Sequence, residues 1–478
     1  MDTNHSPLPP ALIEAFTALL GASAVVTEAD ALEPYLEEPR GRYHGAATCV
    51  VRPGNTQEVA ELVKLCTSHG VPIVPQGGNT GLVGGSVSEA GTVILSLGRM
   101  NKMRALDNLN NTITVEAGCI LSQVQTWAEE ADLLFPLSLA AEGSCQIGGN
   151  LATNAGGINV LRYGNARDLA LGLEVVLPDG RIWNGLRGLR KDNRGYDLKN
   201  LFIGGEGTLG IITAAVLKLF PPARARETAL IALPDLDAAG TLLTLARRAA
   251  GESLSAFELI ADVGLQFAVK HVDGLSDPFE DSHPWYVLME ITAPGNAPAL
   301  RQTMETLLEG AFEDGVVTDA VLAESGTQTE TLWRLRESIS DVQKFEGGSI
   351  KHDIAVPVSL VTQFIDKASA EITAVMPGVR ICAFGHMGDG NIHFNVSQPL
   401  GMDKDAYLDH WEEFATIVHD IVAEMDGSFS AEHGVGQMKV ADLVHYKSAV
   451  EIDLMRTVKR ALDPKNLMNP GKVILPDG

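Results

Sequence analysis

The sequence predicts an α+β protein with a glycine-rich first domain, an α+β second domain and a helical C-terminal segment. Three observations lead to this prediction: a length of 478 residues, two successive alternations of strand and helix patterns, and 48 glycines gathered in a few loops. At about 100–200 residues per domain, this length corresponds to roughly two to four domains. Glycines clustered in loops indicate close approach of the backbone to a ligand.

The composition excludes several classes of protein. Hydrophobic residues make up 45% of the chain and charged residues 20%, which is enough apolar material for buried cores and rules out global disorder. The formal net charge of −25 repels phosphate backbones and anionic lipids. We therefore expect no nucleic acid and no acidic membrane among the partners.

The cysteines and the N-terminal residues predict a cytoplasmic protein. The five cysteines form no CxxC pair and are expected to be reduced thiols. The opening MDTNHSPLPP has no basic region, and Glu14 interrupts the apolar run that follows, so we expect no signal peptide. No run approaches the ~18 uncharged apolar residues of a membrane span.

The first domain is expected over residues 1–222, with a helical lead-in before its first strand. Asn55 and Glu58 form a capping signal for a helix that ends at Gly70. A second helix is predicted over residues 121–132. Strands are predicted at CVVRP, VPIVPQ, TVILSL, TITVEAG and LEVVLPDGRIW.

A second domain is expected over residues 223–425, because the glycine-rich loops disappear after Pro222 and a new alternation begins. Its predicted order is ALIALPD, a helix through Leu243, YVLMEITA, a helix from Ala299, and VVTDAVLAE. Residues 426–478 end in the turn-rich DPKNLMNPGKVI, and we expect this segment to pack back on the first domain.

Two glycine-rich loops are the strongest sign of a cofactor. QGGNTGLVGGS, residues 76–86, follows a strand, and its glycines can expose consecutive backbone N–H groups to an anion such as a pyrophosphate. EGSCQIGGNLATNAGG, residues 142–157, has the same character and no basic residue. Two neutral loops of this kind predict a dinucleotide held by main-chain groups.

A third glycine segment matches a dinucleotide fingerprint only formally. GGEGTLG places glycines at 205, 207 and 210 in a GxGxxG spacing. The residues that follow, IITAAVLKLF, predict a strand where a phosphate-binding helix should begin. We therefore do not expect a Rossmann site, although the loop can still touch a cofactor held by the other two.

Together QGGNTGLVGGSV, EGSCQIGGNLATNAGG followed by RYGN, and GGEGTLGIIT resemble the PCMH-type FAD-binding domain of the vanillyl-alcohol-oxidase flavoprotein superfamily. The resemblance implies FAD with its pyrophosphate on residues 76–86 and its flavin near residues 148–157. We expect no covalent link between a histidine and the flavin, because no histidine lies in the glycine loop and His44 precedes the first strand. The implied cofactor-binding residues are Pro75, Gly77, Gly78, Asn79, Thr80, Gly81, Gly84, Gly85, Ser86, Gly143, Ser144, Gly148, Gly149, Thr153, Asn154, Gly156, Gly157, Glu206, Gly207, Ile211, Asn391 and Asn469.

A histidine and glutamate cluster predicts a metal site. GHMGDGNIHFN places His386 and His393 on either side of a predicted hairpin turn, and SAEHGVG supplies Glu432 and His433. Two histidines and one carboxylate are the minimum set for a divalent ion with open positions. Zinc is the first choice on ligand type, and manganese, iron and cobalt accept the same atoms.

This second signature is similar to the FAD-linked D-2-hydroxy acid dehydrogenases over about residues 48–473. The resemblance implies His386, His393 and Glu432 as metal ligands. At His352, where relatives commonly carry an aromatic residue of the pocket wall, this chain departs from the family pattern. The substrate-binding residues that it implies are Arg336, Ser340, Lys351, Asn395 and His433.

The residues of WRLRESISDVQKFEGGSIKHD give this assignment a physical basis. Arg336 and Ser340 lie four apart on a predicted helix, so one face presents a guanidinium and a hydroxyl that suit a carboxylate. An alternative is that Arg336 pairs with a nearby surface acid. Lys351 has a similar alternative, a solvated charge on an edge strand.

The predicted reaction is oxidation of a D-2-hydroxy acid to a 2-oxo acid. The metal would bind the hydroxyl and a carboxylate oxygen, His433 would take the hydroxyl proton as the catalytic base, and a hydride would pass to flavin N5. The motif match favours D-2-hydroxyglutarate; D-lactate, D-malate and glycolate are alternatives. Electron-transfer flavoprotein is the external acceptor that the resemblance implies, with quinone or oxygen as alternatives, and a homodimer is also expected.

Two other classes of function compete with this prediction. A metal-dependent hydrolase would use His386, His393 and Glu432 to activate water, but it leaves the glycine loops unexplained. An FAD-binding isomerase or transferase without net redox chemistry would keep the glycine loops and lose the hydroxy acid. Flavin absorbance, and its bleaching by a hydroxy acid, separates these classes.

Overall fold

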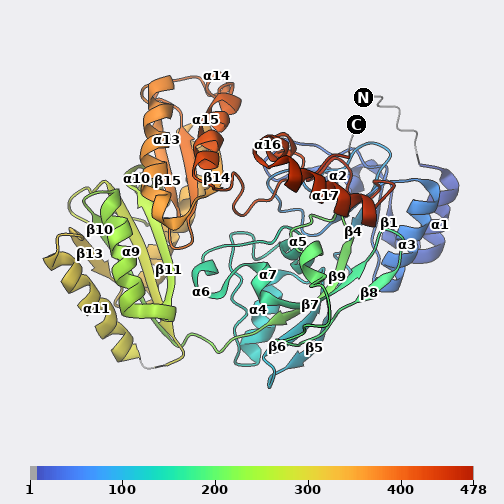
Figure 1. Ribbon diagram of the computed structural model, residues 1–478, viewed down its shortest axis with the longest axis horizontal. Helices are drawn as coiled ribbons and strands as arrows, with labels where there is room; N and C mark the ends of the chain where they lie inside the picture. Colours follow the sequence, from blue (N-terminus) through green and yellow to red (C-terminus); the bar gives the residue numbers. More distant parts are fainter. Residues whose placement is uncertain (1–7, 296, 477–478) are drawn as a thin grey trace. The chain divides into compact units, whose positions relative to one another are not determined.

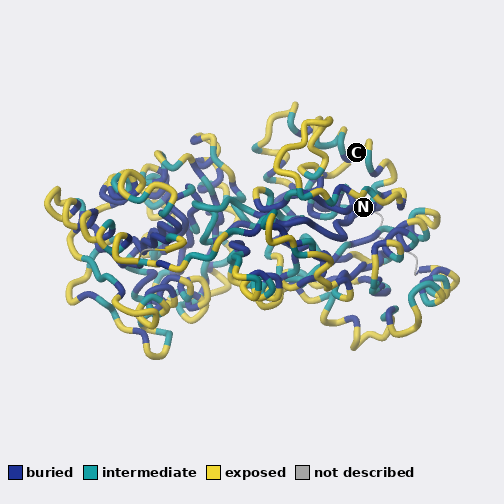
Figure 2. Tube along the Cα trace, turned by 90° about the horizontal axis from the view of Figure 1, so that it is seen from below, coloured by how far each residue is buried: buried dark blue, intermediate teal, exposed yellow. Residues whose placement is uncertain are grey.

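The computed structural model describes residues 8–295 and 297–476, and the chain divides into two compact units (Figure 1). Unit 1 contains the residues up to Gly156, Gly164–Pro221 and the residues from Glu432 on; unit 2 contains Gly157–Tyr163 and Pro222–Ala431. The predicted boundaries were 222/223 and 425/426, and residues 1–7 and 477–478 of those predicted domains lie outside the described residues. Buried residues gather inside each unit (Figure 2).

Unit 1 begins with a helical lead-in and a four-stranded sheet in the order β1-β2-β4-β3. The predicted capping signal is confirmed, since Asn55 Oδ1 accepts a hydrogen bond from the Glu58 amide and Gly70 ends the helix in the left-handed conformation. The helices here are α1 (Pro10–Leu20), α2 (Ala29–Leu36) and α3 (Thr56–His69), and the strands are β1 (Val25–Val26), β2 (Cys49–Val51), β3 (Ile73–Gln76) and β4 (Val93–Ser96).

A second, antiparallel sheet in unit 1 has the order β5-β6-β9-β7-β8. The segment after GGEGTLG is β9, as predicted, and not a phosphate-binding helix. The strands are β5 (Met103–Asp107), β6 (Thr112–Glu116), β7 (Ala170–Val176), β8 (Ile182–Asn184) and β9 (Ile211–Lys218), and the helices are α4 (Leu121–Glu130), α5 (Ile147–Ala152), α7 (Ala166–Leu169) and α8 (Lys199–Phe202).

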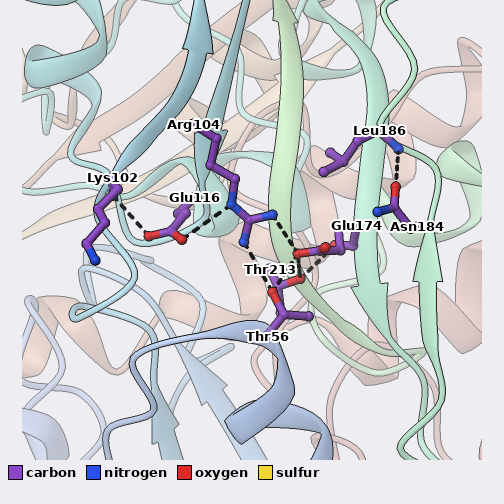
Figure 3. Close-up of polar contacts among 8 residues, drawn as sticks. All are labelled: Thr56, Lys102, Arg104, Glu116, Glu174, Asn184, Leu186 and Thr213. Carbon is purple, nitrogen blue, oxygen red and sulfur yellow. Dashed lines mark hydrogen bonds and ion pairs between the residues drawn. The ribbon is translucent and has the colours of Figure 1, made fainter.

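A buried polar network joins α3 to this second sheet (Figure 3). The Glu174 carboxylate on β7 accepts hydrogen bonds from Thr56 Oγ1 at 2.5 Å, Thr213 Oγ1 at 2.9 Å and Arg104 Nη1 at 3.0 Å. Arg104 also reaches Glu116 on β6. One carboxylate therefore satisfies donors from three other elements, in a place where unsatisfied polar groups would be costly.

The C-terminal segment returns to unit 1, as predicted. The Ile73 amide donates to the Leu467 carbonyl, and the Asn469 amide donates to the Ile73 carbonyl, so this segment extends the pairing of β3. Lys459 Nζ donates to the Thr208 carbonyl and to the Asp463 carboxylate. The helices of this segment are α16 (Val440–Tyr446) and α17 (Ala449–Leu462).

Unit 2 is built on a seven-stranded antiparallel sheet in the order β13-β10-β12-β11-β15-β16-β14. The strands are β10 (Ala225–Leu233), β11 (Leu254–Ala261), β12 (Trp285–Ala293), β13 (Asp319–Leu322), β14 (Ser349–Ala355), β15 (Arg380–His386) and β16 (Asn391–Ser397). The helices are α6 (Val160–Tyr163), α9 (Leu236–Ala250), α10 (Asp262–His271), α11 (Ala297–Glu313), α12 (Gly326–Val342), α13 (Val361–Val375), α14 (Lys404–Leu408) and α15 (Trp411–Glu424).

Alternation along these strands gives the sheet two different faces. One face packs with α9, α11, α13 and α15 in a large apolar core that includes Phe257 and Phe394. The other face packs with α10 and α12 and includes Ile260 and Phe384. Successive strand residues point to opposite faces, so the register fixes which polar side chains share the α12 face.

The network around Glu174 yields a test of unit 1 stability. We expect Glu174→Ala to lower the free energy of unfolding by about 3 kcal/mol, because it leaves two buried hydroxyls without their carboxylate acceptor and removes one of the two carboxylates that bind Arg104. Glu61→Ala on α3 is the matched control, since Glu61 makes exposed contacts with Gln57 and Lys64. Urea denaturation curves of the two variants should differ clearly, and equal midpoints would contradict the role given to Glu174.

Candidate functional site

A cavity of about 310 Å³ in unit 1 is walled by the predicted glycine loops. Residues 75–83 form one wall, most residues between Cys145 and Gly156 form another, and Glu206, Gly207 and Ile211 come from the third glycine segment. The first of these segments begins at the end of β3, and the second contains α5. The three glycine motifs, separated in sequence, therefore meet at one cavity.

The glycines are needed here for close approach and for open space. A Cβ atom on Gly78 would collide with the Ser144 carbonyl, so only glycine lets the two loops lie against each other. A Cβ on Gly81 or Gly149 would meet no atom within 4 Å, so these positions face free space. This main-chain cradle fits a flat dinucleotide such as FAD, whose pyrophosphate needs backbone N–H groups and no cation.

Several predicted cofactor residues do not line the cavity. Ser144 backs Gly78, and Asn154 Oδ1 accepts a hydrogen bond from the Arg167 amide at 2.9 Å. Asn391 belongs to unit 2, where its amide is bound by Asp353 and the Ile354 carbonyl. The predicted residues outside the cavity wall are Gly84, Gly143, Ser144, Asn154, Gly157, Asn391 and Asn469.

Glu206 and Asn469 tie the cavity wall to the C-terminal segment. The Glu206 carboxylate accepts hydrogen bonds from the Val435 and Gly436 amides at 2.7 and 2.8 Å. Asn469 Nδ2 donates to the Gly85 and Glu206 carbonyls at 2.9 and 2.8 Å. Burial raises the pKa of Glu206, while the two amides act in the opposite direction. These bonds fix the loop that begins with Glu432 and His433, both of which line the cavity.

The α12 face of the unit 2 sheet carries most of the other predicted site residues. In the register, His386 on β15 pairs with Glu258 on β11, and His393 on β16 pairs with Asp353 on β14. Phe384 pairs with His393 across β15 and β16. The two imidazole rings lie 5.7 Å apart with an interplanar angle of 76°. The predicted hairpin thus places both histidines next to each other on the α12 face of the sheet.

Glu258 is the residue at this face that sequence reasoning did not identify. Its carboxylate lies 2.7 Å from His386 Nδ1, and it accepts hydrogen bonds from Arg336 Nε at 2.9 Å and Arg336 Nη2 at 2.7 Å. Burial raises the pKa of Glu258, but the opposing charges and hydrogen bonds of His386 and Arg336 bring it down to about 2. Glu258 is therefore an ionised carboxylate with 1% side-chain exposure.

Asp353 stands behind His393 more loosely. Its Oδ1 lies 3.9 Å from His393 Nδ1 and accepts a hydrogen bond from Asn391 Nδ2 at 3.0 Å. Phe384 packs against the His393 ring at 5.1 Å. Both histidines thus have a buried carboxylate on a neighbouring strand.

The predicted substrate residues of unit 2 lie together. Lys351 Nζ donates to the Ser340 carbonyl at 2.7 Å, Lys351 pairs with Asn395 in the register, and Ser340 follows Arg336 by one turn of α12. Arg336 is buried and bound to Glu258, so the alternative of a surface ion pair is wrong. The Asn395 amide donates to Gln343 at 3.2 Å.

His352 faces away from the predicted substrate residues of β14. His352 pairs with Phe394 in the register, and Phe394 belongs to the apolar core on the opposite face of the sheet. Its ring lies 6.1 Å from His419, and its Nδ1 lies 2.8 Å from the Phe394 carbonyl. The period of two along β14 sends Lys351 and Asp353 to the site face and His352 away from it.

The metal set predicted from sequence comes from both units. His386 and His393 lie in unit 2, and Glu432 lies in unit 1. Glu432 directly follows Ala431, whose amide donates to the Asp353 carbonyl at 3.3 Å inside unit 2. The five cysteines are free and buried, which agrees with the expectation of reduced thiols and leaves oxygen and nitrogen donors for a metal. Among residues 8–295 and 297–476, no helix is long and apolar enough to cross a membrane.

Comparisons with known proteins agree with this division. Residues 47–185 match the model of an FAD binding domain, and residues 222–473 match that of the FAD linked oxidases, C-terminal domain. The chain is 40% identical over 463 residues to a probable mitochondrial D-2-hydroxyglutarate dehydrogenase of Oryza sativa subsp. indica, covering 96% of this chain and 81% of the relative. It is 38% identical over 447 residues to a D-2-hydroxyglutarate dehydrogenase of Xanthomonas citri pv. viticola, covering 94% and 93%.

Among solved structures, p-cresol methylhydroxylase with substrate bound superimposes with a TM-score of 0.78 at 18% identity, covering 98% of this chain and 96% of that one. The fold is therefore of the predicted PCMH type. The chain belongs to the FAD-linked oxidases, and it is an FAD-binding oxidoreductase. Within that family it belongs with the FAD-linked D-2-hydroxy acid dehydrogenases, the group that the sequence motifs indicated.

Glu206 gives a test of how the cavity wall is held. We expect Glu206→Ala to weaken FAD retention and to lower the free energy of unfolding by about 2–4 kcal/mol, because two buried amides lose their acceptor. Glu206→Gln should have a smaller effect, since one oxygen can still accept. Flavin released on gel filtration and the thermal midpoint measure the two effects. Unchanged values in both variants would contradict this role.

Proposed function

We propose that this protein is an FAD- and divalent-metal-dependent dehydrogenase that oxidises D-2-hydroxyglutarate to 2-oxoglutarate. The observation that carries the proposal is the α12 face of unit 2, where two histidines lie beside a buried arginine and a lysine. The relatives named above, D-2-hydroxyglutarate dehydrogenases that share most of this chain, support the choice of substrate.

The cavity of unit 1 is the proposed FAD site. Its walls are made of glycines and small residues, and they leave room for a flat ring system and a neutral cradle for a pyrophosphate. FAD, when bound, supplies an acceptor for the hydride of the substrate α-carbon. The protein's part is to hold the cofactor, and to place Glu432 and His433 in the cavity wall.

His386, His393 and Glu432 are the proposed metal ligands. Imidazole nitrogens and a carboxylate oxygen suit zinc, and also manganese, iron or cobalt. The proposal rests on the donor types, on the pairing of the two rings in unit 2 and on the chain continuity that leads from Ala431 to Glu432. A divalent ion held by such residues withdraws charge from a substrate hydroxyl and lowers the pKa of that hydroxyl.

Arg336 and Lys351 are the proposed partners of the substrate carboxylates. A dianionic substrate is repelled by a chain with net charge −25, so cations fixed at the site must offset this field. Arg336 Nε and Nη2 are bound to Glu258, while no hydrogen bond of Nη1 is found within the described ranges. Ser340 and Asn395 add a hydroxyl and an amide next to these cations.

His433 is the proposed general base. It lies in the wall of the cavity, next to a proposed metal ligand, and an imidazole has a pKa suited to accepting a proton near neutral pH. Removal of the hydroxyl proton at His433 makes loss of the α-hydride easier. We further propose that electrons leave to electron-transfer flavoprotein and that the chain acts in the cytoplasm as a homodimer.

Anaerobic visible spectra test substrate and metal together. D-2-hydroxyglutarate should bleach the flavin absorbance more completely than D-lactate, because Arg336 and Lys351 can meet both of its carboxylates and D-lactate has only one. D-malate carries two carboxylates that are one methylene closer together, and we expect it to bleach the flavin less completely than D-2-hydroxyglutarate. Treatment with a chelator should abolish the bleaching and added Zn²⁺ should restore it. Bleaching by D-lactate alone would replace the proposed substrate, and bleaching that survives metal removal would remove the metal from the proposal.

His433→Gln tests the base. We expect a fall in kcat of about 10²–10⁴-fold, the usual contribution of a positioned general base, with FAD and metal content unchanged. His445→Gln is the matched control, because His445 lies on the exposed part of α16 in the same unit. Stopped-flow flavin reduction measures both variants, and a His433→Gln enzyme with normal reduction would show that another group takes the proton.

A further inference from the structure

We infer that Glu258 is a positioning residue that sets the proposed metal ligand His386 and the proposed substrate ligand Arg336 at the same time. The inference rests on the proposed function and extends it to a residue that none of the site motifs contains. It depends on contacts inside unit 2 alone. Glu258 acts through its two partners and is not itself a ligand.

The strand register brings Glu258 and His386 together. Glu258 pairs with His386 across β11 and β15, and both side chains point to the α12 face of the sheet. Side chains directly opposite in an antiparallel pair have Cβ atoms about 4.5–5.5 Å apart, close enough for the 2.7 Å contact seen between the carboxylate and Nδ1. The backbone of two central strands therefore fixes this contact.

The contact selects one tautomer of His386. One Glu258 oxygen lies 2.7 Å from His386 Nδ1, and the charged Arg336 guanidinium binds the other oxygen, so the carboxylate accepts and the proton of a neutral His386 stays on Nδ1. The lone pair is then on Nε2, the nitrogen that can bind a metal in this tautomer. Carboxylate partners of this kind orient metal-bound histidines and raise their basicity.

The other carboxylate oxygen holds Arg336. Oε2 accepts hydrogen bonds from Nε at 2.9 Å and from Nη2 at 2.7 Å, whereas Oε1 serves His386. Phe384 covers one face of the guanidinium, with its ring centroid 4.8 Å from Cζ. A planar group bound along one edge and covered on one face has a fixed direction for Nη1.

A purely structural carboxylate in the same sheet shows the contrast. Glu290 on β12 is also buried, and it accepts from Trp333 Nε1 at 2.9 Å, Thr228 Oγ1 at 3.2 Å and Ser255 Oγ at 3.3 Å. None of these partners belongs to the proposed site. Glu258 instead contacts two site residues, His386 with one oxygen and Arg336 with the other. The inference therefore predicts that a substitution of Glu258 weakens both metal binding and substrate binding.

The first experiment compares Glu258→Gln with Glu290→Gln in FAD-loaded protein. Glutamine has one acceptor oxygen, so it cannot serve His386 and Arg336 together. Isothermal titration with Zn²⁺ should give a Kd 10–100-fold higher for Glu258→Gln than for wild type, and a KM for D-2-hydroxyglutarate raised in addition. Glu290→Gln should leave both values unchanged even if it lowers the thermal midpoint.

A second pair of variants keeps the test valid if Glu258→Gln does not fold, since the glutamine leaves the buried Arg336 charge without its partner. Arg336→Met should weaken substrate binding and leave the Zn²⁺ Kd unchanged. Arg336→Met combined with Glu258→Gln removes both charges and should raise the Zn²⁺ Kd 10–100-fold above that of Arg336→Met alone.

The outcomes separate this inference from the proposed function. Wild-type protein that binds no Zn²⁺ would contradict the proposed metal site and the inference with it. Wild-type protein that binds Zn²⁺, with the same Kd in Glu258→Gln or in the double variant, would overturn the inference alone. If Glu290→Gln weakened Zn²⁺ binding as much as Glu258→Gln does, Glu258 would be only one of several residues that stabilise unit 2. That result would also overturn the inference.

Discussion

The burial of one negative charge organises the site face of unit 2. A lone carboxylate in an apolar sheet would be neutralised, because transfer of an ionised group out of water costs many kcal/mol. Glu258 avoids this through contacts with His386 and Arg336, which come from β15 and α12. The need to satisfy this charge thus draws a strand and a helix to fixed positions. The proposed metal ligand and the proposed substrate ligand are set by the same requirement.

Unit 1 solves a different problem, since its cavity must accept a charged cofactor without cations. Backbone amides take the place of cations here. Glycines allow the loops to lie against each other, as at Gly78 and Ser144, and leave the amides open to a ligand. The wall is in turn fixed by hydrogen bonds between loop backbone and the side chains of Glu206, which lines the wall, and Asn469, which does not. Residues that shape a cavity need not line it. Asn469, which the family resemblance implied as a cofactor-binding residue, holds the wall without lining it.

Sequence patterns predicted most of the fold and part of the site. Local signals were sufficient where the chemistry is local: the glycine loops, the capping residue Asn55, and the turn between His386 and His393. The predicted alternation of the second domain missed β11, the strand that carries Glu258. Its sequence, LSAFELIA, is an apolar run with one acid, and its pairing with β15 joins residues 128 positions apart. Such a pairing depends on the assembled sheet.

The same reasoning explains why His352 faces away from the site residues. A family resemblance assigns a position to a pocket, whereas the side a residue faces is decided by the register of its strand, which a shift of one residue would invert. Lys351 and Asp353 face α12, and His352 between them must face the apolar core.

The carboxylates beside the two histidines make different contacts. Glu258 lies 2.7 Å from His386 Nδ1 and binds Arg336 with its other oxygen, whereas Asp353 Oδ1 lies 3.9 Å from His393 Nδ1 and accepts a hydrogen bond from Asn391. The direction of His386 is therefore set by a charge-assisted contact between two neighbouring strands. This contact places the geometric constraint on the strand pair that carries Glu258.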